Sequence, residues 1–300
     1  MAEISAPLPH SRMAKRWQSP ALLIVPLLAF QLFFFFAPAI RLMLFSLMTQ
    51  TPQGDIGAPW TFSHYLHFFS VALYSDILWN TLRISLITAL IAAVLAYPVA
   101  AVLVRGNALI SRILTLVIIA PLAVSVVVRA YGWQLILNNG PTGLLNYLLL
   151  HLGLVDRPNA LMFTEWAVVI GSLHIFFPMM VLPLASALGK IDPALPFAAR
   201  TLGAPPWQVF FRITLPLTLP GLAAGMTLVF SLAAGSYVIP ALTGGPRAQM
   251  LGNLVEQQIV AVYDWPFGAT IATILVVIVI AVNTLSMKLL GGRRLPGAGK

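Results

Sequence analysis

Residues 198–216 read AARTLGAPPWQVFFRITLP and separate two long apolar runs of the chain. The stretch carries Arg200 and Arg212, and Lys190 lies shortly before it. Lysine and arginine between membrane spans mark a cytoplasmic connection. The stretch therefore predicts a cationic cytoplasmic loop, holding a short helix that ends at Gly203, in a chain that crosses a membrane several times.

The composition of the 300-residue chain places lipid, and not water, around most of its surface. Charged residues make up 8% and apolar residues 59% of the chain, against about 25% and 45–50% in soluble domains. The net charge of +9 does not indicate nucleic-acid binding, because the basic residues form no single patch. Cysteine is absent, which excludes disulfides, a cysteine nucleophile and a cysteine zinc site.

Six stretches are long and apolar enough to cross about 30 Å of hydrocarbon, which takes roughly 20 residues. The first is longer than the core of a signal peptide and no small-residue cleavage site follows it, so we expect it to be retained. Neighbouring helices can compensate for the prolines within the spans. We expect an all-α membrane protein with spans at 21–47, 82–104, 111–130, 166–189, 215–240 and 267–290.

The basic residues also predict the topology, because they concentrate on the cytoplasmic side of membrane proteins. Twelve of the 17 fall in the two tails and in the second-to-third and fourth-to-fifth connections, whereas six of the eight acids fall on the other side. We expect both termini in the cytoplasm, and a soluble helical bundle does not explain this asymmetry. The twelve are Arg12, Lys15, Arg16, Arg105, Arg112, Lys190, Arg200, Arg212, Lys288, Arg293, Arg294 and Lys300.

The cytoplasmic loop contains conflicting signals for the start of its helix. Asp192 and Pro193 are typical of an N-cap and a first helical residue. Pro196 would then lose the bond to the Asp192 carbonyl and clash with it. We therefore expect a helix from Pro196 to Leu202, with Gly203 as the left-handed residue that follows.

Such a helix is about 10 Å long and would be marginal alone in water, so it needs a partner surface. Ala198, Ala199 and Leu202 share a face whose small side chains suit a groove on another protein. We expect Trp207 to Arg212 to form a second short helix and Pro216 to begin the fifth span. The alternative is an ordinary connection between two spans.

The spacing Ala-Ala-x-x-x-Gly, nine residues, then Ile-x-Leu-Pro resembles the loop by which permease subunits of binding-protein-dependent ABC importers contact their ATPases. The family usually has Glu at the position of Phe197, and Pro196 is also atypical. This departure implies weaker or asymmetric contact on this side. The coupling residues that the resemblance implies are Phe197, Ala198, Ala199, Arg200, Leu202, Gly203, Ile213, Leu215 and Pro216.

Other segments resemble the spermidine/putrescine permease group within that family. They include Arg129-Ala130-Tyr131-Gly132-Trp133, Gly140 to Asn146, Ser236-Tyr237-Val238-Ile239-Pro240 and Asp264-Trp265-Pro266. The resemblance implies a type I importer fold, with a permease core at 78–290 that includes a coupling loop at 190–214. A first helix with its outer loop at 21–77 precedes the core, and cytoplasmic tails occupy 1–20 and 291–300.

The resemblance also implies the partners and the location of the chain. They are a second permease subunit (a homologue or a copy), two ATPase subunits that hold ATP and Mg, and an external solute-binding protein. The expected location is the inner membrane of a bacterium. We expect no cofactor in this chain, which lacks the Gly-x-x-x-x-Gly-Lys-Ser/Thr phosphate-binding pattern.

Polar side chains near the outer ends of the spans are candidates for the solute pathway, because ionisable groups in a bilayer cost roughly 2.5–3.5 kcal/mol each on insertion scales. Arg129 is a pathway residue or a snorkelling anchor. Glu165 is expected to pair with an arginine, and His174 to be a satisfied core residue. Glu256 and Asp264 contact the binding protein or a cationic solute, or else lie on a solvated face. The full candidate set is Arg129, Tyr131, Trp133, Glu165, Ser236, Tyr237, Glu256 and Asp264.

Three further patterns predict packing and not chemistry. Gly221 and Gly225 predict close helix contact, and Asn283 a hydrogen bond to another helix. Leucines at helical spacing in 142–155 predict an amphipathic helix, lying at the membrane interface or packed on the outer ends of the spans. His64 and His67 lack the neighbouring ligands of a metal site.

We therefore expect a permease subunit that moves a small solute and performs no chemistry. Polyamines are favoured by the resemblance, with opines, amino-phosphonates and amino acids as alternatives. A secondary transporter working without ATPases would typically show inverted repeats and paired broken helices, which the sequence does not indicate. An intramembrane enzyme would need a nucleophile and base or a ligand set at membrane depth, where His174 stands alone.

Overall fold

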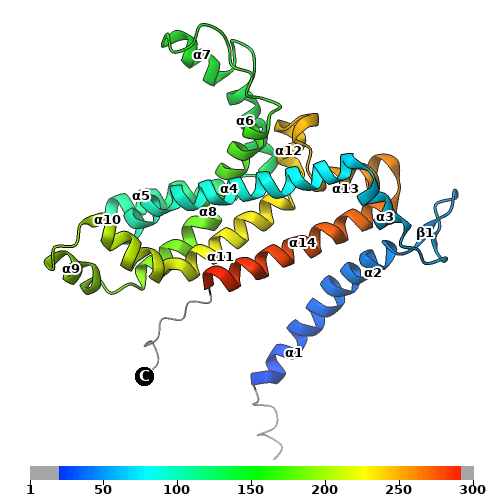
Figure 1. Ribbon diagram of the computed structural model, residues 1–300, viewed down its shortest axis with the longest axis horizontal. Coiled ribbons are helices and arrows are strands. Elements are labelled where there is room, and N and C mark those ends of the chain that lie inside the picture. The colour runs from blue at the N-terminus through cyan, green and yellow to red at the C-terminus, as the bar shows by residue number, and fades with distance from the viewer. Residues whose placement is uncertain (1–19, 292–300) are drawn as a thin grey trace, which may run out of the picture.

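The computed structural model describes residues 20–291, with side chains from 24 to 289. This part of the chain is helical apart from one two-stranded hairpin, β1 and β2 (Figure 1). Six of the seven basic residues that the topology argument places in the tails lie outside the described residues; the seventh, Lys288, lies in the last turn of α14. The longer elements are α1 Pro20–Gln31, α2 Ala37–Phe45, α3 Ser63–Ser70, α4 Ala72–Arg105, α5 Ala108–Ile119, α6 Val126–Leu137, α7 Leu144–His151, α8 Glu165–Gly189, α9 Ala194–Thr201, α11 Leu215–Ala234 and α14 Trp265–Gly291.

Shorter elements connect them. Five-residue π-helical turns join α1 to α2 (Leu32–Phe36) and α10 to α11 (Phe210–Thr214), and a longer one (Gln257–Val262) follows α13. Two 3-10 turns lie at Ala120–Ala123 and Pro246–Ala248. The remaining elements are β1 Thr49–Gln50, β2 Ile56–Gly57, α10 Pro206–Val209, α12 Val238–Thr243 and α13 Leu251–Glu256.

The centre of the fold is the packing of α4 against α8 and α11. Small side chains such as Ala89, Ala92 and Ala96 line the buried face of α4 and let the other helices approach closely. Gly225 of α11 has the same role, since a Cβ there would lie 2.7 Å from the Met180 sulfur and 3.1 Å from the Met180 carbonyl oxygen. The predicted close packing at Gly221 and Gly225 is therefore confirmed, and the partner helix is α8.

α14 completes the bundle against α11 and also contacts α2, α3 and α13. Asn283 Nδ2 donates to Ser231 Oγ on α11 at 2.7 Å, which confirms the predicted bond between helices. Near the other end of α14, the buried Thr270 hydroxyl donates to the Ser46 carbonyl at 3.2 Å and ties the end of the first span to the bundle.

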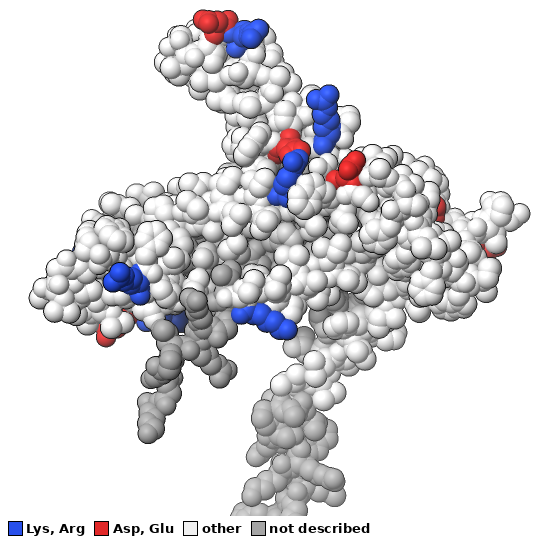
Figure 2. Space-filling view, viewed as in Figure 1, with Lys and Arg blue, Asp and Glu red and all other residues white. Residues whose placement is uncertain are grey.

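Most of the remaining surface is apolar, as a lipid-facing protein requires. The Ile24–Phe45 helix buries none of its side chains within this chain, and Phe33 is 71% exposed. Figure 2 shows the long face of the bundle with few charged atoms. Five described helices are long and apolar enough to span a membrane, and a bent pair brings the number to six. Multiple spans are therefore confirmed.

The predicted third span at 111–130 is wrong as a straight helix. α5 and its 3-10 turn end at Ala123, and α6 begins at Val126 with a bend of 106°. The cause is local: Pro121 cannot donate the next helical bond, Val124 and Ser125 are extended, and Ser125 Oγ accepts from the Val127 amide at 3.3 Å as an N-cap.

Two other spans have different limits from those predicted. The second helix begins at Ala72 and not at residue 82. The short helix predicted at Trp207 to Arg212 is present as α10 and the π-helical turn, and α11 begins at Leu215 with Pro216 in its first turn. What the prediction missed is that the helix is continuous from Pro206 to Ala234. A π-helical turn directly before Leu215 accommodates the missing amide of Pro216. The fifth helix then ends at Ala234, with Gly235 as its C-cap, and not at residue 240.

The predicted amphipathic helix in 142–155 is present as α7, which lies beyond the far end of α6 and away from the bundle (Figure 1). Asn146 fixes its base, because its Nδ2 donates to the carbonyls of Asn138 (2.9 Å) and Asn159 (3.1 Å). Leu144, Leu148 and Leu152 are about half to two-thirds exposed. Leu145, in contrast, packs against the buried cluster of Leu137, Met162 and Ala167 at the ends of α6 and α8. The base of α7 therefore packs on the spans, and the location of its exposed leucines at the membrane interface stays a prediction.

Candidate functional site

The helix α9 projects beyond the packed spans at one end of the bundle (Figure 1). It begins at Ala194, two residues earlier than predicted. Asp192 Oδ1 accepts from the Ala194 amide at 2.8 Å and caps the first turn. Pro196 occupies the third helical position, where an amide would have no helical partner in any case, so the expected clash does not arise.

The end of α9 follows the prediction closely. Gly203 has φ +84°, a backbone region that suits glycine. The Gly203 amide donates to the Arg200 carbonyl at 2.9 Å and the Ala204 amide to the Ala199 carbonyl at 3.0 Å. This pair of bonds is a Schellman motif, which satisfies the last carbonyls and turns the chain toward α10.

Several apolar side chains of this loop have no cover within the described chain. Leu202 is 89% exposed, Phe197 68% and Leu195 48%. Ala198 is also exposed, and Ala199 is half-buried. Exposed apolar groups gathered on one short helix are typical of a contact surface for another protein.

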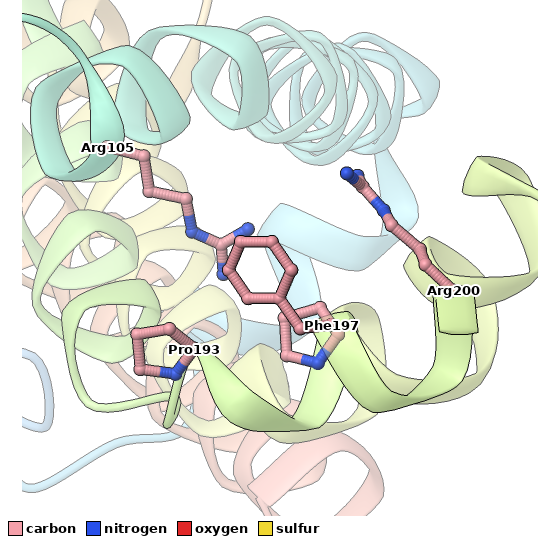
Figure 3. Close-up of a pocket in the computed structure, with 5 residues that line it drawn as sticks. Arg105, Pro193, Phe197 and Arg200 are labelled. Carbon is pink, nitrogen blue, oxygen red and sulfur yellow. The ribbon is translucent and has the colours of Figure 1, made fainter. Parts of the chain in front are cut away.

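A hollow of about 320 Å³ lies beside α9 (Figure 3). Pro193, Pro196, Phe197 and Arg200 line it from α9, at the i, i+3, i+4 and i+7 positions of one helical face, and Arg105 lines it from the last residue of α4. A second hollow of about 340 Å³ shares Arg105, Pro196 and Arg200 and continues toward Tyr97 and Phe210.

The later coupling residues connect α9 to the centre of the fold. Ile213 lies in the π-helical turn that contacts α9. Leu215 packs against the buried cluster of α4, α8 and α11, and Pro216 is half-buried in the same continuous helix. The Tyr97 hydroxyl of α4 lies 2.9 Å from the Thr218 hydroxyl of α11. α9 therefore neighbours two central helices, α4 at Arg105 and α11 through the π-helical turn that precedes it.

The pathway candidates divide into two groups in space. Arg129, Tyr131 and Trp133 lie on α6, and Arg129 Nη1 donates to the Ile175 carbonyl of α8 at 3.4 Å. Trp133 Nε1 donates to His174 Nδ1 at 3.2 Å. His174 is therefore hydrogen-bonded as predicted, but it is exposed within this chain and is not a core residue. With Trp133 it lines a largely apolar hollow of about 470 Å³ between α4, α5, α6 and α8.

Glu165 pairs with Arg83 of α4, which confirms the predicted arginine partner. Both side chains are more than a third exposed, so the pair contributes at most about 1 kcal/mol to stability. Among residues 24–289 it is the one ion pair.

The second group lies around α12, α13 and the start of α14. The Tyr237 carbonyl accepts from Asn253 Nδ2 at 2.8 Å, and Gly252 packs on the Ser236 backbone, because a Cβ there would lie 2.7 Å from the Ser236 carbonyl oxygen. Asp264 Oδ1 accepts from the Phe267 amide at 3.0 Å as a helix cap. Glu256 is exposed.

Two residues of these sites were missed by the sequence reasoning. Arg105 was counted only as a topology marker, although a basic residue at the end of a span next to the coupling loop is the available signal. Arg83 was assigned only to the outer side. Its pairing with Glu165 joins helices 82 positions apart in sequence, which no local pattern indicates.

Comparison with known proteins agrees with this geometry. Residues 85–293 match the family described as binding-protein-dependent transport system inner membrane component. The chain is 35% identical over 256 residues to the spermidine/putrescine transport system permease protein PotB of Escherichia coli K12, covering 85% of this chain and 92% of that protein. It is 33% identical over 262 residues to PotB of Haemophilus influenzae, covering 86% and 91%.

A solved structure shares the fold. It belongs to a bacterial ABC transporter involved in the import of the acidic polysaccharide alginate. The TM-score is 0.70 at 19% identity, and the match covers 95% of this chain and all of that one.

Proposed function

This chain belongs to the binding-protein-dependent transport system inner membrane components, and we propose that it imports polyamines and that its helix α9 contacts an ATPase subunit. It is a multi-pass permease subunit of an ABC importer. The substrate proposal rests on identity of 33–35% over most of the chain to spermidine/putrescine permeases. The proposed complex contains two ATPase subunits holding ATP and Mg, a second permease subunit and an external solute-binding protein.

The observation that carries the coupling role is the exposed, capped helix α9 beside the bundle. Its outer face is apolar, with Leu202 89% exposed. Its other contacts lead to α4 and to the 206–234 helix. In this proposal α9 and both termini are cytoplasmic, and closure of the ATPase pair shifts α9 and switches the pathway between outward-facing and inward-facing states.

Replacing Gly203 tests the coupling role. Gly203→Val forces a β-branched residue to φ +84° and should distort the end of α9, with a loss of ATPase co-purification and of uptake. Gly203→Asn is the matched control, because asparagine tolerates the left-handed region, and it should keep both. Full ATPase retention and uptake by Gly203→Val, with membrane levels equal to wild type, would overturn the coupling role.

The substrate proposal needs a separate experiment. Proteoliposomes containing the complete complex and its binding protein should take up radiolabelled spermidine only with internal ATP. Competition by unlabelled putrescine and by an opine, an amino-phosphonate and an amino acid ranks the solute classes. Uptake without nucleotide would instead indicate a secondary transporter, and failure of both polyamines to compete would reject polyamines as the substrate.

A further inference from the structure

We propose that the hollow beside α9 receives a carboxylate side chain of the ATPase subunit, so that the permease supplies the positive groups of this contact. The hollow is the one lined by Arg105, Pro193, Pro196, Phe197 and Arg200. The inference rests on the proposed function, in which α9 contacts an ATPase.

Two guanidinium groups from different elements face this hollow. Arg105 comes from the end of α4 and Arg200 from the last turn of α9, and Figure 3 shows them extending into the hollow from opposite sides, with the Phe197 ring on the side of Arg105. Like charges that face one space repel each other, and an anion between them removes that repulsion. The planar fork of each guanidinium also matches the two oxygens of a carboxylate.

The described part of the chain places no carboxylate between Arg105 and Arg200. The acid next to α9, Asp192, uses its carboxylate to cap the Ala194 amide. The one ion pair within residues 24–289 joins Arg83 and Glu165, on other elements. Both Arg105 and Arg200 are exposed, so a group from outside can reach them.

Phe197 explains why the acid has to come from a partner. Loops that resemble this one usually have Glu at this position, and a glutamate here would lie one helical turn from Arg200, within reach of an ion pair. Phenylalanine leaves both arginines without an acid from its own position and contributes an aromatic ring to the lining of the hollow. An acid that enters here would lie beside an apolar ring, with Leu195 and Leu202 exposed nearby, and such apolar neighbours exclude water from a charged contact between proteins.

Restoring the usual residue gives the sharpest test. Phe197→Glu should pair with Arg200 and Arg105, occupy the hollow and lower ATPase retention about tenfold, the loss for one charge-assisted contact. Phe197→Gln has the same shape without the charge and should lose much less. Phe197 is 68% exposed, so neither variant should affect folding, which the thermal unfolding midpoint of the isolated permease checks.

Removing the arginines gives the complementary result. Arg105→Ala and Arg200→Ala should each lower ATPase retention about tenfold. Because the contact is charged, the ATPase should also leave the detergent-solubilised complex at a lower salt concentration than in wild type. In a chain that already carries Phe197→Glu, replacing both Arg105 and Arg200 by Ala should lower ATPase retention little further, because the glutamate already fills the hollow. Arg112→Ala is the control, since Arg112 is exposed near the same end of the bundle and does not line the hollow.

The ATPase used is the subunit that co-purifies with the tagged wild-type chain, identified by mass spectrometry. A photoreactive phenylalanine at position 197 should crosslink to an ATPase peptide that contains an Asp or Glu, and the reversal of that acid to Lys should reproduce the Arg200→Ala loss. The inference fails if Phe197→Glu retains the ATPase as well as Phe197→Gln does. It also fails if the arginine effects are present in nanodiscs that contain anionic lipid and disappear in nanodiscs of zwitterionic phosphatidylcholine alone, because the headgroup of an anionic lipid would then be the occupant. If wild type retains no ATPase, the proposed function itself fails.

Discussion

The α9 loop and the α5–α6 bend use the same local signals, a polar cap and a proline, with opposite consequences for the chain. In α9, Asp192 caps a helix whose proline at 196 lies in the first turn, and the helix stays whole. At the bend, Pro121 ends one helix and Ser125 caps the next, so the span breaks by 106°. The position of the proline relative to the cap decides the outcome: within the first turn it removes no bond, and before a cap it ends the helix.

The two regions also differ in what holds them. Hydrogen bonds within its own loop cap both ends of α9: Asp192 caps the first turn, and the Schellman pair at Gly203 caps the last. α6 is held by side chains that reach other parts of the chain, including Gln134 Nε2 to the Leu242 carbonyl at 2.5 Å and Trp133 to His174 at 3.2 Å. The loop is therefore closed by its own bonds, whereas the bend is caused locally and the direction of α6 after it depends on tertiary contacts.

The largest effect is expected from removing both signals at the bend. The double variant Pro121→Leu/Ser125→Ala should let α5 continue through residues 124–125, move α6 away from α8 and abolish uptake. The natural chain has no cysteine, so spin labels on Trp79→Cys and Leu135→Cys, both at exposed positions, report the distance between α4 and α6 without background. Pro121→Leu alone keeps the Ser125 cap and should keep the wild-type distance. An unchanged distance in the double variant would contradict the role of these signals.

A smaller effect is expected from the contacts that hold the end of α6. Asn139 Oδ1 accepts from the Met162 amide at 2.8 Å and its Nδ2 donates to the Met162 carbonyl at 3.2 Å. Asn139→Ala leaves both backbone groups of this buried residue unpaired and should cost about 2 kcal/mol. Asn139→Asp keeps the acceptor and should cost about half as much. Thermal unfolding midpoints in detergent measure both, and equal midpoints for the two variants would reject this account.

The cap of α9 should contribute less than the Asn139 contacts. Asp192→Ala removes the acceptor of the Ala194 amide and should destabilise α9 by about 1 kcal/mol, which loosens ATPase contact several-fold without unfolding the bundle. Asp192→Ser retains a capping oxygen and serves as the control. Hydrogen exchange of the α9 amides measures the effect directly. Exchange as slow in Asp192→Ala as in wild type would show that the cap is dispensable.

The smallest effect is expected at Pro196. Pro196→Ala returns an amide at a position where the helix offers it no partner, so stability and ATPase retention should change by less than about 0.5 kcal/mol. A large loss would mean that the fit of the ring in the hollow, which it lines, matters more than its backbone position.

Much of the fold could be predicted from hydropathy. Four of the six spans are long apolar helices, and their predicted segments either match the observed helix within a few residues or lie inside it. The bend at 124–125 was missed because hydropathy counts apolar residues and ignores backbone donors, although Pro121 and Ser125 were visible signals. The fifth helix was predicted to begin too late, because three prolines between 205 and 216 indicated a loop and a π-helical turn carries the helix through them.

The candidate site divides in the same way. The end of α9 at Gly203 was predictable from one glycine after a helical run, because its φ of +84° is a local requirement. The hollow was not, because it needs Arg105 to lie beside Phe197, a contact between segments some 90 residues apart in sequence. Likewise, the partner of Glu165 was expected to be an arginine, but only the packing of α4 on α8 selects Arg83.

The sequence by itself determined that this chain crosses a membrane several times and carries a capped, cationic loop between two spans, because hydropathy, charge asymmetry and caps are properties of neighbouring residues. Only the tertiary structure decided where α6 points, which arginine pairs with Glu165, and that Arg105 and Arg200 face one hollow around Phe197. These features depend on which helices lie side by side. That is set by the small buried residues of α4 and the glycines of α11 acting together, and not by any single stretch of sequence.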